Sequence, residues 1–250
     1  MTIRPDYTHV AAKDQIASAE NEVDAPKGDS LAYGGKLEGS GRFLVRSARS
    51  RDGLEGRRRV VTVLFADLRG SLDLIAARDL AEAREILDGV LRTMIEAVHS
   101  AGGIVNQVLG DGLMALFGAE DSPTDHATAA CLAALGMHAG VGRQAGLLRA
   151  AHGADVSIRV GINSGEVLVR SIETDLGRDY TAVGSPTHVA ARMEQLARPG
   201  STLITAETRR LADPTLHLLP MGQLDVKGLP EGIEAFELLG PASPGARSHR

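Results

Sequence analysis

Apolar and polar residues follow two different periods along this chain. A nearly continuous apolar run at 60–65 (VVTVLF) contains three valines, and such runs are typical of a strand covered on both faces. Between residues 86 and 98 the apolar positions recur with helical spacing. This spacing predicts a long amphipathic helix that is closed by Gly102 and Gly103.

Two glycine-containing clusters predict hairpins. Apolar runs flank Gly110–Gly112, which predicts a β-hairpin with Asp111 exposed at its turn. The stretch around 163–165 (NSG) has the same surroundings and predicts a second hairpin. Between them, residues 124–153 form a long Ala-rich segment, and we expect a helix there with Ser122 as its cap and Pro123 in its first turn.

The remaining segments complete the expected order of elements. Residues 185–198 read as a third helix that ends at Pro199 and Gly200. Four apolar segments then predict short strands, at 202–205, 216–220, 224–228 and 235–240. The order predicts an α+β fold, with a ferredoxin-like β-α-β-β-α-β core whose helices pack against a mostly antiparallel sheet.

Composition divides the 250 residues into one main domain and two flanking segments. Residues 1–57 are rich in Gly, Ser, Ala and charge, so we expect a flexible N-terminal extension. Residues 58–240 are predicted to form the folded domain, and 241–250 a disordered C-terminal tail. The single cysteine, Cys131, excludes an intramolecular disulfide, and we interpret it as a core residue.

Charge and hydropathy exclude two classes of partner. The net charge is −5, and aromatic residues make up 3% of the chain, so no basic, aromatic-rich track for nucleic acid exists. No run of about 18 apolar residues and no apolar signal segment is present. We therefore expect a cytoplasmic protein without membrane insertion.

Two aspartates stand at predicted strand ends. Asp67 follows the first strand and Asp111 lies in the first hairpin, so the two meet if those strands are neighbours. Paired carboxylates suit Mg²⁺ or Mn²⁺, which takes its remaining ligands from water and from the phosphates of a nucleoside triphosphate. Gly70 and Ser71 can open a helix whose N–H groups face phosphate. The alternative is that both aspartates only cap turns.

Five separated motifs resemble one enzyme family. They are VTVLFADLRGS, VNQVLGDGLMALFG, IRVGINSGEVLV, DYTAVGSPTHVAARMEQLARPG and LDVKGL. In order and approximate spacing they are similar to class III adenylyl/guanylyl cyclase catalytic domains, over roughly residues 57–240. The resemblance implies a homodimer in which two domains pair head to tail, with each active site shared between them.

The resemblance also implies a role for individual residues. Asp67 and Asp111 would hold two metal ions, Mg²⁺ or Mn²⁺, with help from the carbonyl of Leu68. Arg159 would contact the triphosphate beside them. From the partner chain, Arg192 would stabilise charge on the α-phosphate as the ribose 3′-oxygen attacks, and Lys227 would bind the terminal phosphates.

Three positions concern the base and the ribose. Gln107 occupies the place of a base-reading lysine, and Thr181 that of its companion. A glutamine amide offers a donor and an acceptor side by side, so it can match adenine, guanine or a pyrimidine. His188 replaces an asparagine that orients the ribose; it can donate one hydrogen bond as the amide does, but it is bulkier.

These features predict a nucleotidyl cyclase that converts a nucleoside triphosphate into a 3′,5′-cyclic nucleotide and pyrophosphate. ATP is the expected substrate because adenylyl activity is the commonest in similar domains. GTP and the pyrimidine triphosphates remain alternatives. A degenerate domain that binds nucleotide without turnover is a further alternative, motivated by Gln107 and His188. So is a regulatory dimerisation module that contacts another protein through residues 1–57.

Overall fold

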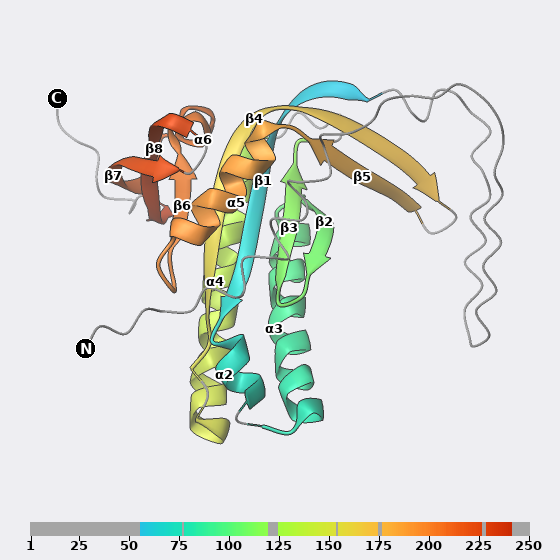
Figure 1. The fold of residues 1–250 in the computed structure, drawn as a ribbon, viewed down its shortest axis with the longest axis vertical. Coiled ribbons are helices and arrows are strands. Elements are labelled where there is room, and N and C mark those ends of the chain that lie inside the picture. Colours follow the sequence, from blue (N-terminus) through green and yellow to red (C-terminus); the bar gives the residue numbers. More distant parts are fainter. Residues whose placement is uncertain are drawn as a thin grey trace. The chain divides into compact units, whose positions relative to one another are not determined.

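The computed structural model describes residues 56–76, 78–119, 125–153, 155–174, 177–226 and 229–241 (Figure 1). The predicted N-terminal extension and C-terminal tail lie outside these ranges, except at their inner ends.

The described part begins with a long strand and alternates between strands and helices. Its elements are β1 (Arg57–Arg69), α2 (Ser71–Ala76), α3 (Leu80–Ser100), β2 (Ile104–Leu109), β3 (Gly112–Phe117), α4 (His126–His152), β4 (Ser157–Thr174), β5 (Gly177–Val183), α5 (Ser185–Leu196), β6 (Thr202–Thr205), α6 (Ala206–Leu211), β7 (Leu216–Val226) and β8 (Leu229–Pro241).

The strands form one sheet in the order β2-β3-β1-β4-β6-β8-β7, and β5 pairs with β4 beside this path. All the pairs are antiparallel except β4 with β6. The first six long elements, β1-α3-β2-β3-α4-β4, confirm the predicted β-α-β-β-α-β core and the α+β fold class.

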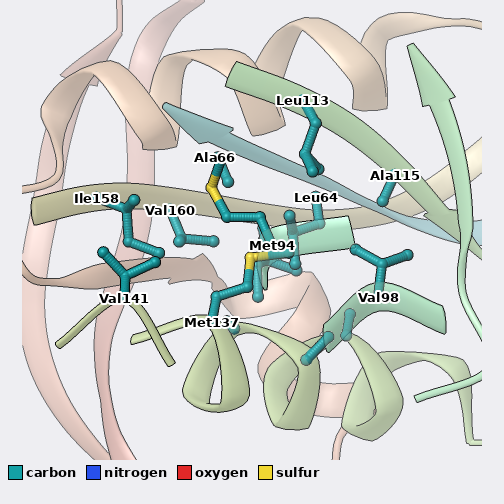
Figure 2. Packing of buried hydrophobic residues seen from close by; sticks show 14 of the residues in the cluster. Leu64, Ala66, Met94, Val98, Leu113, Ala115, Met137, Val141, Ile158 and Val160 are labelled. Atoms are coloured by element: carbon teal, nitrogen blue, oxygen red, sulfur yellow. The ribbon is translucent and has the colours of Figure 1, made fainter. Parts of the chain in front are cut away.

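One face of the sheet is covered by α3 and α4. Leu64 and Ala66 of β1 point into this layer, where they meet Met94 of α3 and Met137 of α4 (Figure 2). Both methionines are fully buried. Because side chains alternate along a strand, Asp67 points to the opposite face.

The opposite face is covered by α5, which lies against β1 and β4 (Figure 1). Val61 and Val63 of β1 form a second cluster there with Ala190 of α5. A Cβ added at Gly161 of β4 would lie 2.0 Å from the backbone nitrogen of Glu194. The backbones of α5 and β4 therefore touch, and only glycine fits between them.

The predicted hairpin at 163–165 is wrong. β4 runs without a turn through these residues, which pair in unbroken register with Val61–Val63 of β1. The polar residues belong inside the strand because their side chains are buried and bonded. Asn163 donates to the carbonyl of Pro186 at 3.0 Å and accepts from Thr205 at 2.7 Å.

The neighbouring Ser164 enters a buried polar cluster on the other face of the sheet. Its hydroxyl bonds Thr62 at 2.7 Å and Thr208 at 3.0 Å, and Thr62 also bonds His126 Nδ1 at 2.7 Å. Burial lowers the pKa of His126. Polar residues that usually mark turns here satisfy one another inside the fold.

Three other boundaries differ from prediction. α4 begins at His126 with Asp125 as its N-cap, which accepts from Thr128 N; the expected cap, Ser122, lies outside the described residues. The strand predicted at 216–220 and the described part of that predicted at 224–228 belong to one strand, β7, whose pairing with β8 contains irregularities. The short helix α6 was not predicted.

Two further findings concern Cys131 and the length and apolar content of the helices. Cys131 is fully buried in the core, as predicted, and burial raises the pKa of its thiol to about 12. Among the described helices, none combines the length and the apolar content needed to cross a bilayer.

Candidate active site

The site forms at one end of three neighbouring strands. In the β1 ladders, Asp67 is opposite Gly112 of β3 and opposite Arg159 of β4. The backbone N–H of Leu68 donates to the carbonyl of Asp111 at 3.3 Å. The strand end that carries Asp67 therefore lies directly against the hairpin turn that carries Asp111, as the sequence predicted.

A glycine allows this close approach. A Cβ added at Gly112 would lie 2.6 Å from the carbonyl oxygen of Ala66 and 3.0 Å from Asp67 Oδ1. Gly110, in the same turn, has a φ of 66°, which glycine adopts at low cost. The turn is thus built to bring Asp111 beside Asp67.

Ser71 positions the second carboxylate. Gly70 has a φ of 87°, so the chain turns sharply after β1 and α2 begins at Ser71. The Ser71 hydroxyl donates to Asp111 Oδ2. Ser71 is 8% exposed, so the bond to this carboxylate is largely shielded from water.

Arg159 lies between two carboxylates. Its Nη2 is 3.0 Å from Asp67 Oδ2 and 2.7 Å from Glu194 Oε1. Its Nη1 donates to the carbonyl of Gln195 at 3.4 Å. The side chains of Arg159 and Asp67 are each 15% exposed, so this cation sits at the rim of the site with one edge reachable from solvent.

The donors at this strand end fit a hard divalent cation. Two carboxylates and the carbonyl of Leu68 would offer it oxygen atoms, which Mg²⁺ and Mn²⁺ prefer as ligands. Within the described ranges, no group of three or more His, Cys, Asp or Glu side chains is placed to hold a metal ion. A Mg²⁺ ion usually takes several of its ligands from water and substrate phosphates.

His188 and Arg192 occupy the outer side of α5. His188 is exposed and Arg192 half-buried, and one helical turn separates them. Arg192 Nη1 donates to the side chain of Gln195 at 2.7 Å. Glu194 is two positions further along, hence about 200° around the helix. Arg192 therefore projects away from the side of α5 that meets Arg159.

Gln107 and Thr181 lie elsewhere in the same chain. Gln107 is exposed on β2, opposite Met114. Thr181 pairs with Arg170 of β4, eleven residues beyond Arg159. At about 3.3 Å per residue this separation is up to about 36 Å. Lys227 lies outside the described residues.

Glu194 is a residue of this site that the sequence analysis missed. It is 1% exposed. It falls in the buried stripe of α5 among Pro186, Ala190 and Met193. A carboxylate in an apolar stripe requires a cationic partner, and that pattern could have revealed it.

Comparison with known proteins gives a family for this arrangement. Residues 55–240 match the family described as the adenylate and guanylate cyclase catalytic domain. The chain is 31% identical to the adenylate cyclase of Anabaena cylindrica over 196 residues, which cover 72% of this chain and 37% of that protein. The chain thus spans well under half the length of the curated relatives it matches, from 18% to 37% in the first two.

Two solved structures share the fold closely. The adenylyl cyclase CyaB from P. aeruginosa superposes with a TM-score of 0.69 at 28% identity, over 74% of this chain and 96% of that one. The guanylyl cyclase Cya2 also gives a TM-score of 0.69, at 25% identity, over 77% and 98% of the two chains.

Proposed function

This chain belongs to the adenylate and guanylate cyclase catalytic domain family, and we propose that it converts a nucleoside triphosphate into a 3′,5′-cyclic nucleotide and pyrophosphate. The observation that carries the proposal is the juxtaposition of Asp67, Asp111 and Arg159 at one strand end. Two anions that can hold metal and one cation that can meet phosphate are what such a reaction requires.

Asp67 and Asp111, with the carbonyl of Leu68, would hold two Mg²⁺ or Mn²⁺ ions. Cyclases of this family generally use divalent metals, which lower the pKa of the attacking hydroxyl and neutralise charge on the phosphates. Ser71 keeps the Asp111 carboxylate oriented through its hydrogen bond. The positive φ of Gly70 lets the chain turn back beside this carboxylate.

The phosphates would be held by cations and by backbone N–H groups. Arg159 already points at Asp67, so it can meet the triphosphate at the edge of the metal site. The first N–H groups of α2, which follow Gly70, would also bind phosphate. Lys227 would reach the terminal phosphates.

The other functional residues would come from a second copy of the chain. Thr181 of β5 pairs with Arg170 of β4, eleven residues beyond the Arg159 that is opposite Asp67, and Arg192 projects from the far side of α5. A twofold homodimer would bring these groups, with Gln107, His188 and Lys227, onto the carboxylates of the partner, and would contain two equivalent sites. In each site Arg192 would stabilise charge that develops on the α-phosphate, and His188 would orient the ribose.

ATP is the proposed substrate, with cyclic AMP as the product. The adenylate cyclase of Anabaena cylindrica and the adenylyl cyclase CyaB support this choice. The fold itself does not discriminate, because the guanylyl cyclase Cya2 superposes equally well. The choice of base therefore depends on side chains, and Gln107 is the proposed reader.

The test is a direct assay of the purified chain. It is incubated with Mn²⁺ and, separately, with ATP, GTP, CTP and UTP, and cyclic products are identified by mass spectrometry. We expect cyclic AMP together with pyrophosphate. Binding of ATP without any cyclic product from the four triphosphates would contradict the proposal and indicate a nucleotide-binding module.

A further inference from the structure

Glu194 is a buried anion without a role in the reaction described so far. It is 1% exposed, and its carboxylate contacts Nη2 of Arg159 at 2.7 Å. A buried carboxylate is costly unless it is paired, and here its cationic partner is itself a residue of the proposed site.

The position of this carboxylate is fixed by backbone packing. A Cβ at Gly161 would lie 2.0 Å from the nitrogen of Glu194 and 2.4 Å from the carbonyl oxygen of Ala190. α5 is therefore in direct contact with β4 at this point. Arg159 lies two residues before Gly161 on the same face of β4. The packing of α5 on Gly161 therefore fixes the backbone of Glu194 beside Arg159.

Arg159 uses the same nitrogen, Nη2, for Glu194 and for Asp67, at 2.7 and 3.0 Å. One cation therefore serves two carboxylates. A divalent ion on Asp67 would be repelled by a guanidinium that stayed on that carboxylate. If a metal ion displaces Arg159 from Asp67, the guanidinium can stay paired with Glu194. Its second terminal nitrogen, Nη1, donates to the carbonyl of Gln195.

We infer that Glu194 is a positioning residue: it holds Arg159 through an ion pair of its own, so that Asp67 is available to metal and Arg159 to phosphate. This inference rests on the proposed function. A positioning role and a purely structural ion pair differ in what they predict for metal binding. If Glu194 is lost, Arg159 should bind Asp67 more tightly, and metal binding at Asp67 should weaken. If Arg159 is removed as well, metal binding should recover.

The experiment measures metal binding without turnover. Free Mn²⁺ is titrated by electron paramagnetic resonance without nucleotide, because a triphosphate chelates Mn²⁺ by itself and because Arg159 is proposed to contact it. We expect Glu194→Gln to raise the dissociation constant for Mn²⁺ by about tenfold or more. The matched control is Glu166→Gln, the same change on an exposed carboxylate of β4 whose ion-pair partner, Arg58, is also exposed, and it should leave the constant unchanged.

A second variant separates positioning from stability. In Glu194→Gln combined with Arg159→Gln, both charges of the buried pair are removed, so the double variant remains informative if the single one does not fold. We expect its Mn²⁺ affinity to return to within about threefold of the wild-type value. Wild-type affinity in a folded Glu194→Gln, or affinity in the double variant that stays as low as in the single one, would overturn the inference.

Asp67→Asn distinguishes failure of this inference from failure of the proposed function. If Asp67→Asn lowers Mn²⁺ affinity and Glu194→Gln does not, the metal site stands and the role of Glu194 is wrong. If Asp67→Asn has no effect on Mn²⁺ binding, the assignment of the metal site itself is wrong, and the inference falls with it.

Discussion

Arg159 of β4 and Asp67 of β1 face each other across the central strand ladder, and their side chains are 3.0 Å apart. The pair joins the proposed metal ligand to the proposed phosphate ligand within one chain. Both side chains are only 15% exposed, so the pair is screened far less than a surface ion pair. The proposed chemistry of the site is therefore organised around this contact.

Asp111→Asn tests the second carboxylate. The amide keeps an oxygen that can accept from Ser71, so the hairpin turn should remain folded, but it lacks the charge that a metal ion needs. We expect cyclase activity to fall by at least about 10²-fold, with a nearly unchanged melting temperature. Asp88→Asn, on the exposed surface of α3, should retain full activity. Substantial activity of Asp111→Asn at saturating Mn²⁺ would exclude it as a metal ligand.

Gln107→Lys tests selection of the base. A lysine offers donors only, so it should disfavour the N1–H of guanine and leave the use of ATP intact or improved. The readout is the ratio of products in mixtures of ATP and GTP. Gln223→Lys, the same change at an exposed position of β7, should not move this ratio. An unchanged ratio in Gln107→Lys would show that Gln107 does not read the base.

Gly161→Ala tests the seating of α5 on β4. The new methyl group would meet backbone atoms of Glu194 and Ala190 at 2.0–2.7 Å, which cannot move aside singly. We expect a loss of about 3 kcal/mol in the free energy of unfolding, measured by urea denaturation. Gly142→Ala, at an exposed position of α4, meets nothing within 4 Å and should be neutral or stabilising by about 0.5–1 kcal/mol. Equal effects of the two changes would contradict the packing.

Stability should depend on pH through buried histidine. Burial lowers the pKa of His138 from 6.5, and its Nε2 bonds the Thr202 hydroxyl at 2.9 Å. The unfolded chain therefore takes up the proton first as the pH falls. The contribution of neutral His138 to the free energy of unfolding is complete above pH 6.5. It is lost as the pH falls from there toward the pKa of His138 in the folded state.

His138→Gln checks this dependence. Its free energy of unfolding should decline less than that of the wild type between about pH 7.5 and pH 5, as measured by urea titrations at each pH. A residual slope is expected, because burial also lowers the pKa of His126. The same slope in His138→Gln as in the wild type would show that His138 does not couple folding to pH.

The sequence predicted those parts of the fold whose signals are local. The apolar run at 60–65 marked β1, and the glycines around Asp111 marked the turn between β2 and β3. It failed at 163–165, where Asn, Ser and Gly usually mark a turn. Here the two polar side chains are bonded to residues such as Thr205 and Thr62, which are distant in the sequence, and no local pattern reveals such partners.

The same reason explains what was missed in the site. Asp67 and Asp111 stand at strand ends, so neighbouring strands bring them together. Glu194 acts through Arg159, 35 positions earlier in the chain, and the contact depends on the close packing of α5 on Gly161. Sequence patterns indicate that a helix has a buried side, but they do not show which strand residue it meets.

The central claim is that each active site is built from two copies of the chain, and mixing two inactive variants tests it most directly. Asp67→Ala and Arg192→Ala should each be inactive alone, because every site in either homodimer lacks one essential group. After subunit exchange, confirmed with differently tagged chains, about half of the dimers should be mixed, each with one intact site. We expect activity to recover to about a quarter of the wild-type value. A mixture that stays inactive despite confirmed exchange would show that the carboxylates and Arg192 act within one chain, and would contradict the account.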